Sequence, residues 1–236
     1  MTPRLEIALV RDLPPFSGID EKSLRDILDM ARASRVKVGE RVFEQDGEAR
    51  EFFLLLDGNI RVVKLTPDGE QVVPRYISAG ELFGIARALN METYPASAVA
   101  ASDCVVLSWP TAVWDGLVAK HPTFATNTYR TVGKRLAETQ QQVVELATAR
   151  VEQRVANAIL KLANQTGRRT PEGILIDFPV TRQDISEMTG TTLHTVSRLM
   201  SSWEDLGWVK SGLKMITLVE GHKLVLVANG VKPDKR

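Results

Sequence analysis

The segment from Thr181 to Met200 constrains the fold of this 236-residue chain most strongly, because it has the pattern of two short helices joined at Gly190. Thr181 and Asp184 have the spacing of a capping box, which marks a helix start. In the second helix, apolar and polar residues separate onto opposite faces at spacings of three and four. The polar face holds only groups that can contact bases or phosphates, so the segment predicts a helix-turn-helix that enters a DNA groove. The inward face would hold Val196, Leu199 and Trp203, and the polar face Thr191, His194, Thr195 and Arg198.

A wing is predicted directly after this helix pair. Leu206–Lys210 and Met215–Val219 have the pattern of strands, and Ser211–Lys214 that of a glycine-containing turn. Residues 151–236 carry 12 Lys or Arg against 9 Asp or Glu, whereas residues 1–150 carry 18 against 20. The basic excess is small, but it lies with the helix pair. The pattern indicates a winged-helix domain, and an ordinary amphipathic helix pair is the alternative.

Short β-rich runs separated by glycines fill the region from Ser34 to Leu107. The sequences Asp57-Gly58-Asn59 and Pro67-Asp68-Gly69 each stand between two such runs, and Asp-Gly forms tight turns at little conformational cost. We therefore predict hairpins at both places and a β-roll or barrel overall. Before this region, Leu5–Met30 is predicted to be mostly helical. The separating glycines are Gly39, Gly47, Gly58, Gly69 and Gly80.

A long helix is predicted from Pro122 to Arg150, a stretch with only one glycine, Gly133. At 1.5 Å per residue it would be about 42 Å long. Its apolar positions alternate at spacings of four and three, as in a coiled-coil seam. We favour a dimer helix shared by two chains, with a core helix of a single chain as the alternative. The seam would comprise Tyr129, Val132, Leu136, Thr139, Val143 and Leu146.

Together these patterns predict an α+β protein with three parts, which are a β-roll sensor domain over residues 1–120, a dimerisation helix over 121–150 and a winged helix over 151–236. No apolar run approaches the roughly 20 residues of a membrane-spanning helix, and the start lacks a secretory pattern, so we expect a cytoplasmic protein. The single cysteine excludes an intrachain disulfide. The sequence has no phosphate loop, nucleophile elbow or metal-ligand spacing, so we do not expect an enzyme.

The order of these parts resembles the CRP/FNR family of bacterial transcription regulators along almost the whole chain. The motifs that carry the resemblance are Gly80-Glu-Leu-Phe-Gly84, Thr181-Arg-Gln-Asp-Ile185 and Thr195-Val-Ser-Arg198. The resemblance implies a cyclic-nucleotide-binding-like β-roll (jelly roll) that senses an effector, and a homodimer that binds a palindromic promoter site in double-stranded DNA and contacts RNA polymerase. The alternative is a cyclic-nucleotide-binding signalling module whose winged helix makes protein contacts only.

The resemblance also implies roles for individual residues in DNA binding. Ser197 and Arg198 would reach base edges, and arginine can donate two parallel hydrogen bonds to guanine. His194 stands where many members carry Glu, so the operator is expected to differ from the usual half-sites, unless His194 only packs against the DNA backbone. The residues expected near phosphates or the groove floor are Thr181, Arg182, Gln183, Thr192 and Thr195.

The effector site is less defined by the sequence. In cyclic-nucleotide binders of the family, a Glu like Glu81 meets the ribose, and an Arg-Ser or Arg-Thr pair about ten residues later meets the cyclic phosphate. The stretch Arg87–Ser97 has no such pair. A buried phosphate without its guanidinium partner is costly, which argues against cyclic AMP. The candidate effector pocket comprises Gly80, Glu81, Leu82, Tyr94 and Ser97.

Haem is a second effector hypothesis. Tyr94–Ser97 and Met188–Arg198 resemble the branch of nitric-oxide-responsive denitrification regulators, some of which use haem. The candidate axial ligands are His121, Cys104, Met91 or a terminal group of the chain. For His121, before a proline at a predicted helix start, and for Cys104, in an apolar run, a structural role is favoured over ligation.

Overall fold

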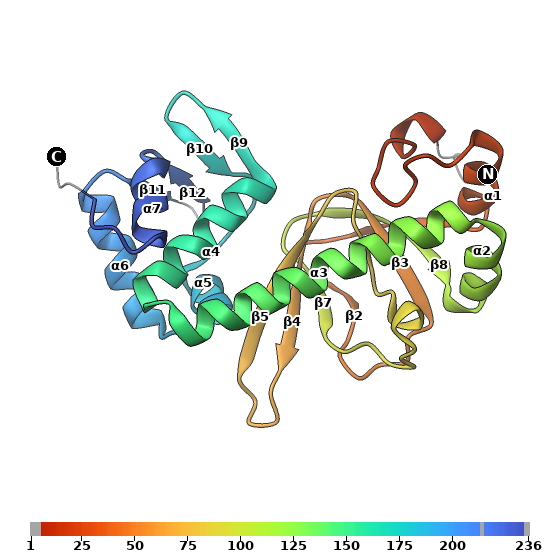
Figure 1. The fold of residues 1–236 in the computed structure, drawn as a ribbon, viewed down its shortest axis with the longest axis horizontal. Coiled ribbons are helices and arrows are strands. Elements are labelled where there is room, and N and C mark those ends of the chain that lie inside the picture. Colours follow the sequence, from red (N-terminus) through yellow and green to blue (C-terminus); the bar gives the residue numbers. More distant parts are fainter. Residues whose placement is uncertain (1–5, 213–214, 234–236) are drawn as a thin grey trace. The chain divides into compact units, whose positions relative to one another are not determined.

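The computed structural model describes residues 6–212 and 215–233 (Figure 1). It contains two compact units. The first comprises Met1–Lys64 and Ile77–Thr139, and the second Leu65–Tyr76 and Gln140–Arg236. Among the described residues, no helix combines the length and apolar character that crossing a bilayer requires. The mixed helix and sheet content confirms the predicted α+β class.

Two sheets form the predicted β-roll. Their strands are β1 (Arg32–Val36), β2 (Arg41–Phe43), β3 (Glu51–Asp57), β4 (Asn59–Leu65), β5 (Gln71–Ser78), β6 (Leu82–Phe83), β7 (Ser97–Ala100) and β8 (Cys104–Pro110). One sheet has the order β1-β8-β3-β6 and the other β2-β7-β4-β5. β8 pairs antiparallel with both β1 and β3, and β7 with both β2 and β4. The predicted roll is therefore confirmed.

One of the two predicted hairpins is wrong. β4 and β5 are neighbours in one sheet, as the Pro67-Asp68-Gly69 sequence predicts. β3 and β4, however, belong to different sheets, so Asp57-Gly58-Asn59 does not close a hairpin. Gly58 instead forms the corner where the chain passes from one sheet to the other, with φ at +89°. A Cβ atom there would lie 2.4 Å from the Asp103 carbonyl oxygen, so only glycine fits.

Aromatic side chains fill the interior of the roll. The ring centroids of Phe43 and Tyr94 lie 3.9 Å apart, and those of Phe53 and Phe83 lie 5.2 Å apart. Phe43 also stacks on both Phe53 and Phe83. Phe53, Phe83 and Tyr94 are buried. The interior is therefore a close-packed core, in which each ring is held by its neighbours.

A second core lies under the helices of the first unit. The elements are η1 (Ile7–Leu9), α1 (Glu21–Leu28), η2 (Ala86–Leu89), η3 (Thr111–Val113) and α2 (Trp114–Lys120). Trp109 of β8 is buried there, and its indole Nε1 donates to the Ile27 carbonyl oxygen at 2.8 Å. The region Leu5–Met30 is less helical than predicted. Prolines 14 and 15 and the positive φ of Gly18, +76°, interrupt it between η1 and α1.

The long helix is confirmed. α3 runs without interruption from Pro122 to Thr148, close to the predicted end at Arg150. Its first turns are anchored in the first unit, because Asn127 is buried and its side-chain amide donates to the Ser17 carbonyl oxygen at 2.8 Å. Farther along, α3 exposes most of its side chains.

The second unit contains the predicted helix pair and wing. Its elements are α4 (Val151–Thr166), β9 (Gly167–Thr170), β10 (Gly173–Ile176), α5 (Arg182–Thr189), α6 (Leu193–Asp205), β11 (Val209–Gly212), β12 (Met215–Leu218) and α7 (Gly221–Ala228). β11 and β12 pair antiparallel as the wing, and they join β10 and β9 in one sheet. Leu213 and Lys214 of the predicted turn lie outside the described residues. The β9–β10 hairpin was not predicted.

The end of the β4–β5 hairpin packs within this second unit. Tyr76 and Phe178 are each 1 % exposed, and their ring centroids lie 4.9 Å apart. The Gln71 side-chain amide donates to the Glu187 carboxylate of α5 at 2.8 Å. Residues 65–76 thus belong to the second unit, where Tyr76 contacts Phe178 and Gln71 contacts Glu187.

Candidate nucleic-acid interface

The first helix of the pair, α5, begins and ends at the predicted residues. The Thr181 hydroxyl accepts from the Asp184 backbone N–H at 3.1 Å, and the Asp184 carboxylate accepts from the Thr181 N–H at 2.8 Å. This is the reciprocal capping box that the sequence predicts. Gly190 ends α5 with φ at +59°, a left-handed conformation that glycine adopts without strain. The turn between the helices is therefore defined by local chemistry.

α6 separates its faces as predicted. Val196, Leu199 and Trp203 are buried, and Met200 joins them on the inward side. The Thr192 hydroxyl caps the helix start by accepting from the Thr195 N–H at 3.2 Å. On the outward side, Thr192, His194 and Arg198 are exposed, and Thr195 and Ser197 are half-buried.

Arg198 and His194 have no partner among the described residues. Neither side chain forms a hydrogen bond or an ion pair with a described residue. Both lie on α6, whose opposite face is buried. An exposed guanidinium and an imidazole therefore project from a rigid support. This is the arrangement that base reading in a major groove requires, because the donors are held ready and no internal bond must first be broken.

Two other residues predicted at the interface are bonded within the unit. Arg182 pairs with Glu204 of α6, with Nη2 3.0 Å from one carboxylate oxygen. The Gln183 side-chain amide donates to the Glu187 carboxylate, one turn along α5, at 2.9 Å. Arg182 therefore links α5 to α6, whereas Gln183 makes only an exposed contact along its own helix.

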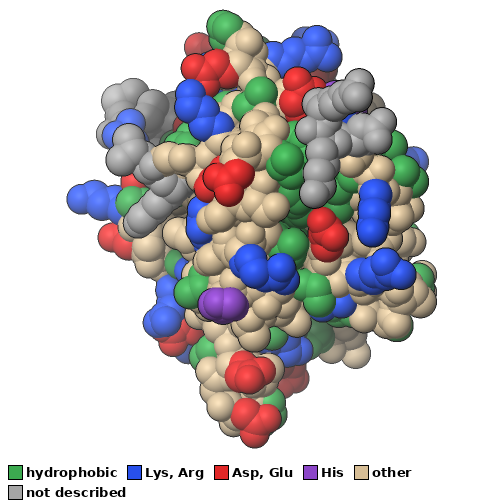
Figure 2. All heavy atoms as spheres, turned by 90° about the vertical axis from the view of Figure 1, so that its left-hand side faces the viewer, with side chains coloured by type: hydrophobic (Ala, Val, Ile, Leu, Met, Phe, Trp, Pro, Cys, Tyr) green, Lys and Arg blue, Asp and Glu red, His purple; other side chains and the backbone are tan. Residues whose placement is uncertain are grey.

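The surface around the helix pair carries charges of both signs. Figure 2 looks onto the side with α6 and α7, where Lys and Arg side chains alternate with Asp and Glu side chains. On the wing, Lys210 pairs with Glu172 at 2.7 Å, and Arg168 of β9 lies 3.4 Å from Asp177. The described side chains on this face therefore include both signs of charge, and several of them are paired with one another.

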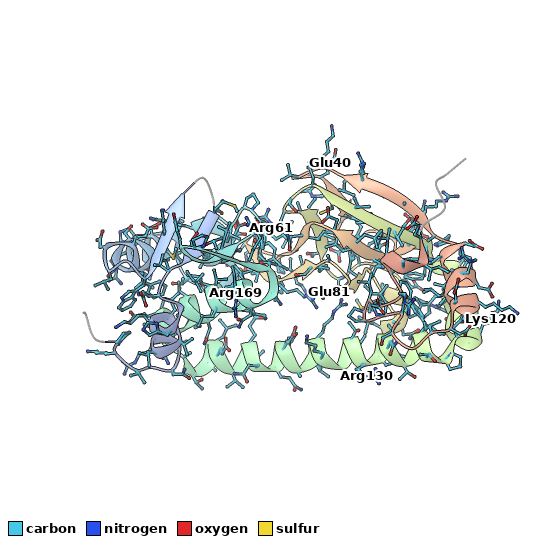
Figure 3. The ribbon with its side chains drawn as sticks, turned by 90° about the horizontal axis from the view of Figure 1, so that it is seen from above. Glu40, Arg61, Glu81, Lys120, Arg130 and Arg169 are labelled. Carbon is cyan, nitrogen blue, oxygen red and sulfur yellow. The ribbon has the colours of Figure 1, made fainter. Side chains whose placement is uncertain are left out.

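The residues of the candidate effector pocket are engaged by the first unit itself. The Glu81 carboxylate accepts from the Ser78 N–H at 3.0 Å and lies 3.6 Å from the Arg135 guanidinium of α3, on the side of the roll next to that helix (Figure 3). Arg135 also donates to the Leu82 carbonyl oxygen. Gly80 has φ at +88°, which allows the turn before Glu81. Glu81 therefore joins the roll to α3.

Tyr94 and Ser97 serve the packing of the roll. The Tyr94 hydroxyl donates to the Glu51 carbonyl oxygen at 2.7 Å and accepts from the Glu51 N–H at 3.2 Å. Burial raises the pKa of this phenol above its ordinary value. The Ser97 hydroxyl accepts from the Gln45 N–H at 2.9 Å. The Tyr94 hydroxyl thus satisfies backbone groups of β3, and the Ser97 hydroxyl a backbone group in the segment after β2.

These residues do not fit a cyclic nucleotide. Arg87, the only arginine in the stretch where the phosphate partner is expected, pairs with Asp115 at 2.6 Å and lies in η2 at the surface. Tyr94 stacks on Phe43 inside the roll. The structure thus supplies no guanidinium for a phosphate beside Glu81 from the Arg87–Ser97 stretch.

The three candidate haem ligands lie in different surroundings. His121 is buried at the junction of α2 and α3, and its Nε2 has no hydrogen-bond partner. Cys104 is buried, its thiol donates to the Ser102 carbonyl oxygen at 3.2 Å, and burial raises its pKa. Met91 is exposed. Among the described residues, no group of His, Cys, Asp and Glu side chains is arranged to hold a metal ion.

The predicted seam forms an apolar strip on α3. Tyr129, Leu136, Val143 and Leu146 are exposed by 58, 59, 61 and 48 %. Val132 is half-buried and packs against the core of the first unit. The Thr139 hydroxyl donates to the Arg135 carbonyl oxygen at 2.9 Å. Large apolar side chains repeated at coiled-coil spacing on one exposed face indicate a surface that another molecule covers.

A β-roll, a long helix and a capped helix-turn-helix with a wing define the class of two-domain, DNA-binding transcription regulators. The sequence matches the family described as cyclic nucleotide-binding domain over residues 34–121, and that described as Crp-like helix-turn-helix domain over residues 153–226. It is 25 % identical to electron transport regulator A of Shewanella oneidensis, over 89 % of this chain and 82 % of that protein. It is also 25 % identical to the fumarate and nitrate reduction regulatory protein of Vibrio cholerae, over 94 % of this chain and 88 % of that protein.

A solved structure shares this fold. The structure of FixK2 from Bradyrhizobium japonicum superimposes with a TM-score of 0.73 and 20 % identity, over 86 % of this chain and 98 % of that one. The chain belongs to the CRP/FNR family of bacterial transcription regulators.

Proposed function

We propose that this regulator acts as a homodimer that binds an inverted-repeat promoter site, with α6 of each protomer in a major groove. The observation that carries the proposal is the outward face of α6, where Arg198 and His194 are exposed and have no partner among the described residues. Arg198 would read a guanine, and His194 a neighbouring base edge. The residues proposed to complete the contacts are Ser197 at the bases and Thr181, Gln183, Thr192 and Thr195 at phosphates or the groove floor.

The apolar strip of α3 supports the dimer. Leu136 and Val143 expose more than half of their surface, and pairing with the same strip of a second copy would remove that surface from water. A two-fold pair of recognition helices then meets half-sites about one DNA turn apart, which makes the operator an inverted repeat.

The remaining parts of the proposal concern regulation. Residues 1–120 would sense an effector other than cyclic AMP, residues 121–150 would pair the protomers, and residues 151–236 would bind DNA and present RNA polymerase with a contact surface. Such a regulator acts in the cytoplasm, on the chromosome. Glu81 supports a link between sensing and pairing, because its carboxylate lies 3.6 Å from Arg135 of α3.

The DNA-binding proposal is tested by selecting duplexes from a random-sequence pool with the purified protein. The recovered sequences are expected to contain an inverted repeat, and the logarithm of the association constant to fall linearly with that of the salt concentration. Binding to no duplex, at any salt concentration, would instead favour a module whose winged helix contacts proteins only.

The dimer proposal is tested by Leu136→Asp. A carboxylate in the centre of the strip would have to be buried without a partner, so monomers are expected in sedimentation equilibrium. The matched control is Val144→Asp, because Val144 is 53 % exposed on α3 but lies off the seam. A dimer that persists in Leu136→Asp, or that dissociates equally in both variants, would show that the strip is not the interface.

A further inference from the structure

Arg182, at the first position of α5, is bonded along one face of α6. Its Nη2 donates to both carboxylate oxygens of Glu204, at 3.2 and 3.0 Å. Its Nη1 lies 3.4 Å from the Ser197 carbonyl oxygen and 3.3 Å from the Ser201 hydroxyl, and donates to both. These partners follow one another at spacings of four and three, so one guanidinium holds about two turns of α6 against the start of α5.

This arrangement differs from that of a residue awaiting a DNA phosphate. Arg198 is exposed and bonded to none of the residues that the structure describes, whereas the Arg182 side chain is only 35 % exposed and bonded to acceptors of the protein. To reach a phosphate, Arg182 would have to break its hydrogen bonds to Glu204. The Glu204 carboxylate, itself 27 % exposed, would then lie unpaired near a polyanion. Both changes oppose the move, since breaking a charged hydrogen-bonded pair leaves one charge uncompensated.

The contacts of Arg182 lie close to the residue that would read bases. Ser197, whose carbonyl oxygen Arg182 contacts, directly precedes Arg198 in the sequence. Bidentate readout of guanine depends on placing the arginine accurately, within roughly half an ångström. The planar guanidinium of Arg182 can supply such positioning, because Nη2 contacts both Glu204 carboxylate oxygens while Nη1 contacts Ser197 and Ser201, which fixes its orientation as well as its distance.

We propose that Arg182 is a positioning residue, which together with Glu204 fixes α6 against α5 and so aims Arg198 at its base, instead of binding a phosphate. The inference rests on the proposed function, because it requires that α6 reads DNA sequence. Arg182 and Glu204 then act as one unit, and removal of either has the same effect on sequence preference.

The experiment measures binding of the full-length protein to a selected operator duplex and to a random duplex, over a series of salt concentrations. The variants are Arg182→Lys, Arg182→Gln, Glu204→Gln and the double variant Arg182→Gln/Glu204→Gln. Arg168→Gln is the matched control, since Arg168 also carries one ion pair in the second unit but contacts neither α5 nor α6 through it. Circular dichroism first establishes that each variant is folded at the assay temperature. If Arg182→Gln is not, Arg182→Lys and Glu204→Gln carry the test.

For a positioning role, we expect the ratio of operator to random affinity to fall about fivefold or more in both Arg182→Lys and Glu204→Gln, with no further loss in the double variant. The salt dependence on random DNA stays that of the wild type. A phosphate contact predicts the opposite pattern. Arg182→Lys keeps its affinity, Arg182→Gln lowers the salt slope by about one, and Glu204→Gln tightens binding to both duplexes. That pattern would overturn the inference.

The wild-type protein separates this inference from the proposed function. A wild type that binds operator and random duplexes equally would refute sequence-specific DNA binding itself. A wild type with a clear preference, which Arg182→Lys and Glu204→Gln both retain, would refute only the positioning role.

Discussion

The outward face of α6 and the interior of the roll use polar side chains in opposite ways. On α6, Arg198 and His194 are exposed and bonded to no described residue. In the roll, Tyr94 is 4 % exposed and its hydroxyl is bonded to both backbone groups of Glu51. A surface that binds a large, rigid partner leaves its donors free, whereas a packed interior must satisfy each polar atom internally. The outward side chains of α6 are therefore available to a partner, whereas the polar groups inside the roll are bonded to its own backbone.

The largest expected difference between the two regions is in stability. Phe53→Ala removes a ring from the aromatic core of the roll and should lower the free energy of unfolding by about 3–5 kcal/mol. Leu193→Ala, on the exposed side of α6 with the side chain 45 % exposed, should change it by no more than about 0.5 kcal/mol. Urea unfolding measures both values, and a similar loss in the two variants would contradict the contrast.

The next effect is on DNA preference. Arg198→Ala should reduce the ratio of operator to random affinity by about 5- to 150-fold, the equivalent of about 1–3 kcal/mol for a bidentate contact with guanine. The melting temperature should stay that of the wild type, because the side chain is bonded to nothing in residues 6–212 and 215–233. Fluorescence anisotropy with labelled duplexes gives the ratio. An unchanged ratio would remove Arg198 from the base-reading residues.

A smaller effect is expected for the Tyr94 hydroxyl. Tyr94→Phe keeps the stacked ring but leaves the Glu51 backbone groups without their partner, so the free energy of unfolding should fall by about 1–2 kcal/mol at neutral pH. The substitution preserves the stacking contact between the ring at position 94 and Phe43. A variant as stable as the wild type would show that the hydroxyl does not contribute.

Tyr94 also gives a pH dependence with a definite sign. Burial raises the pKa of the phenol in the folded protein above its ordinary value of 10.0, so the folded state holds the proton more tightly than the unfolded state. The contribution of the protonated Tyr94 hydroxyl to the free energy of unfolding is complete below pH 10.0. It is lost as the pH rises through the pKa of the folded protein. Above pH 10.0, the wild type should therefore lose stability more steeply than Tyr94→Phe in urea unfolding. Parallel curves would contradict this.

The smallest expected effect is the binding heat of cyclic AMP. Titration calorimetry with the purified protein should give no binding heat, because Arg87 is paired with Asp115 and the Glu81 carboxylate lies beside Arg135. Saturable heat with a stoichiometry of one nucleotide per chain would show that the roll can rearrange around a ligand.

How far the sequence predicts the structure depends on how local each feature is. The capping box of Thr181 and Asp184 and the turn at Gly190 involve neighbours in the chain, and both were predicted correctly. The hairpin at Asp57-Gly58-Asn59 was wrong, because the same turn residues serve equally well at a corner between two sheets. The helix expected over Leu5–Met30 was overestimated, because prolines 14 and 15 and the positive φ of Gly18 interrupt it.

The candidate sites follow the same rule. The outward residues of α6 could be predicted from helical spacing alone, as could the exposed strip with Leu136 and Val143. The pairing of Arg182 with Glu204, 22 residues apart in sequence, could not, because it depends on how two helices cross. The same holds for Glu81 and Arg135, which are distant in the chain and 3.6 Å apart in the structure.

The sequence by itself determined the order of the parts, the faces of α6 and the apolar strip of α3, because the periodicity of side chains and the caps of helices act over a few residues. Tertiary structure alone decided which sheet each strand joins, that Arg182 is bonded to an internal carboxylate, and that aromatic rings occupy the roll. These outcomes depend on contacts between residues far apart in the chain, whose partners are chosen by packing and by the need to satisfy buried polar atoms.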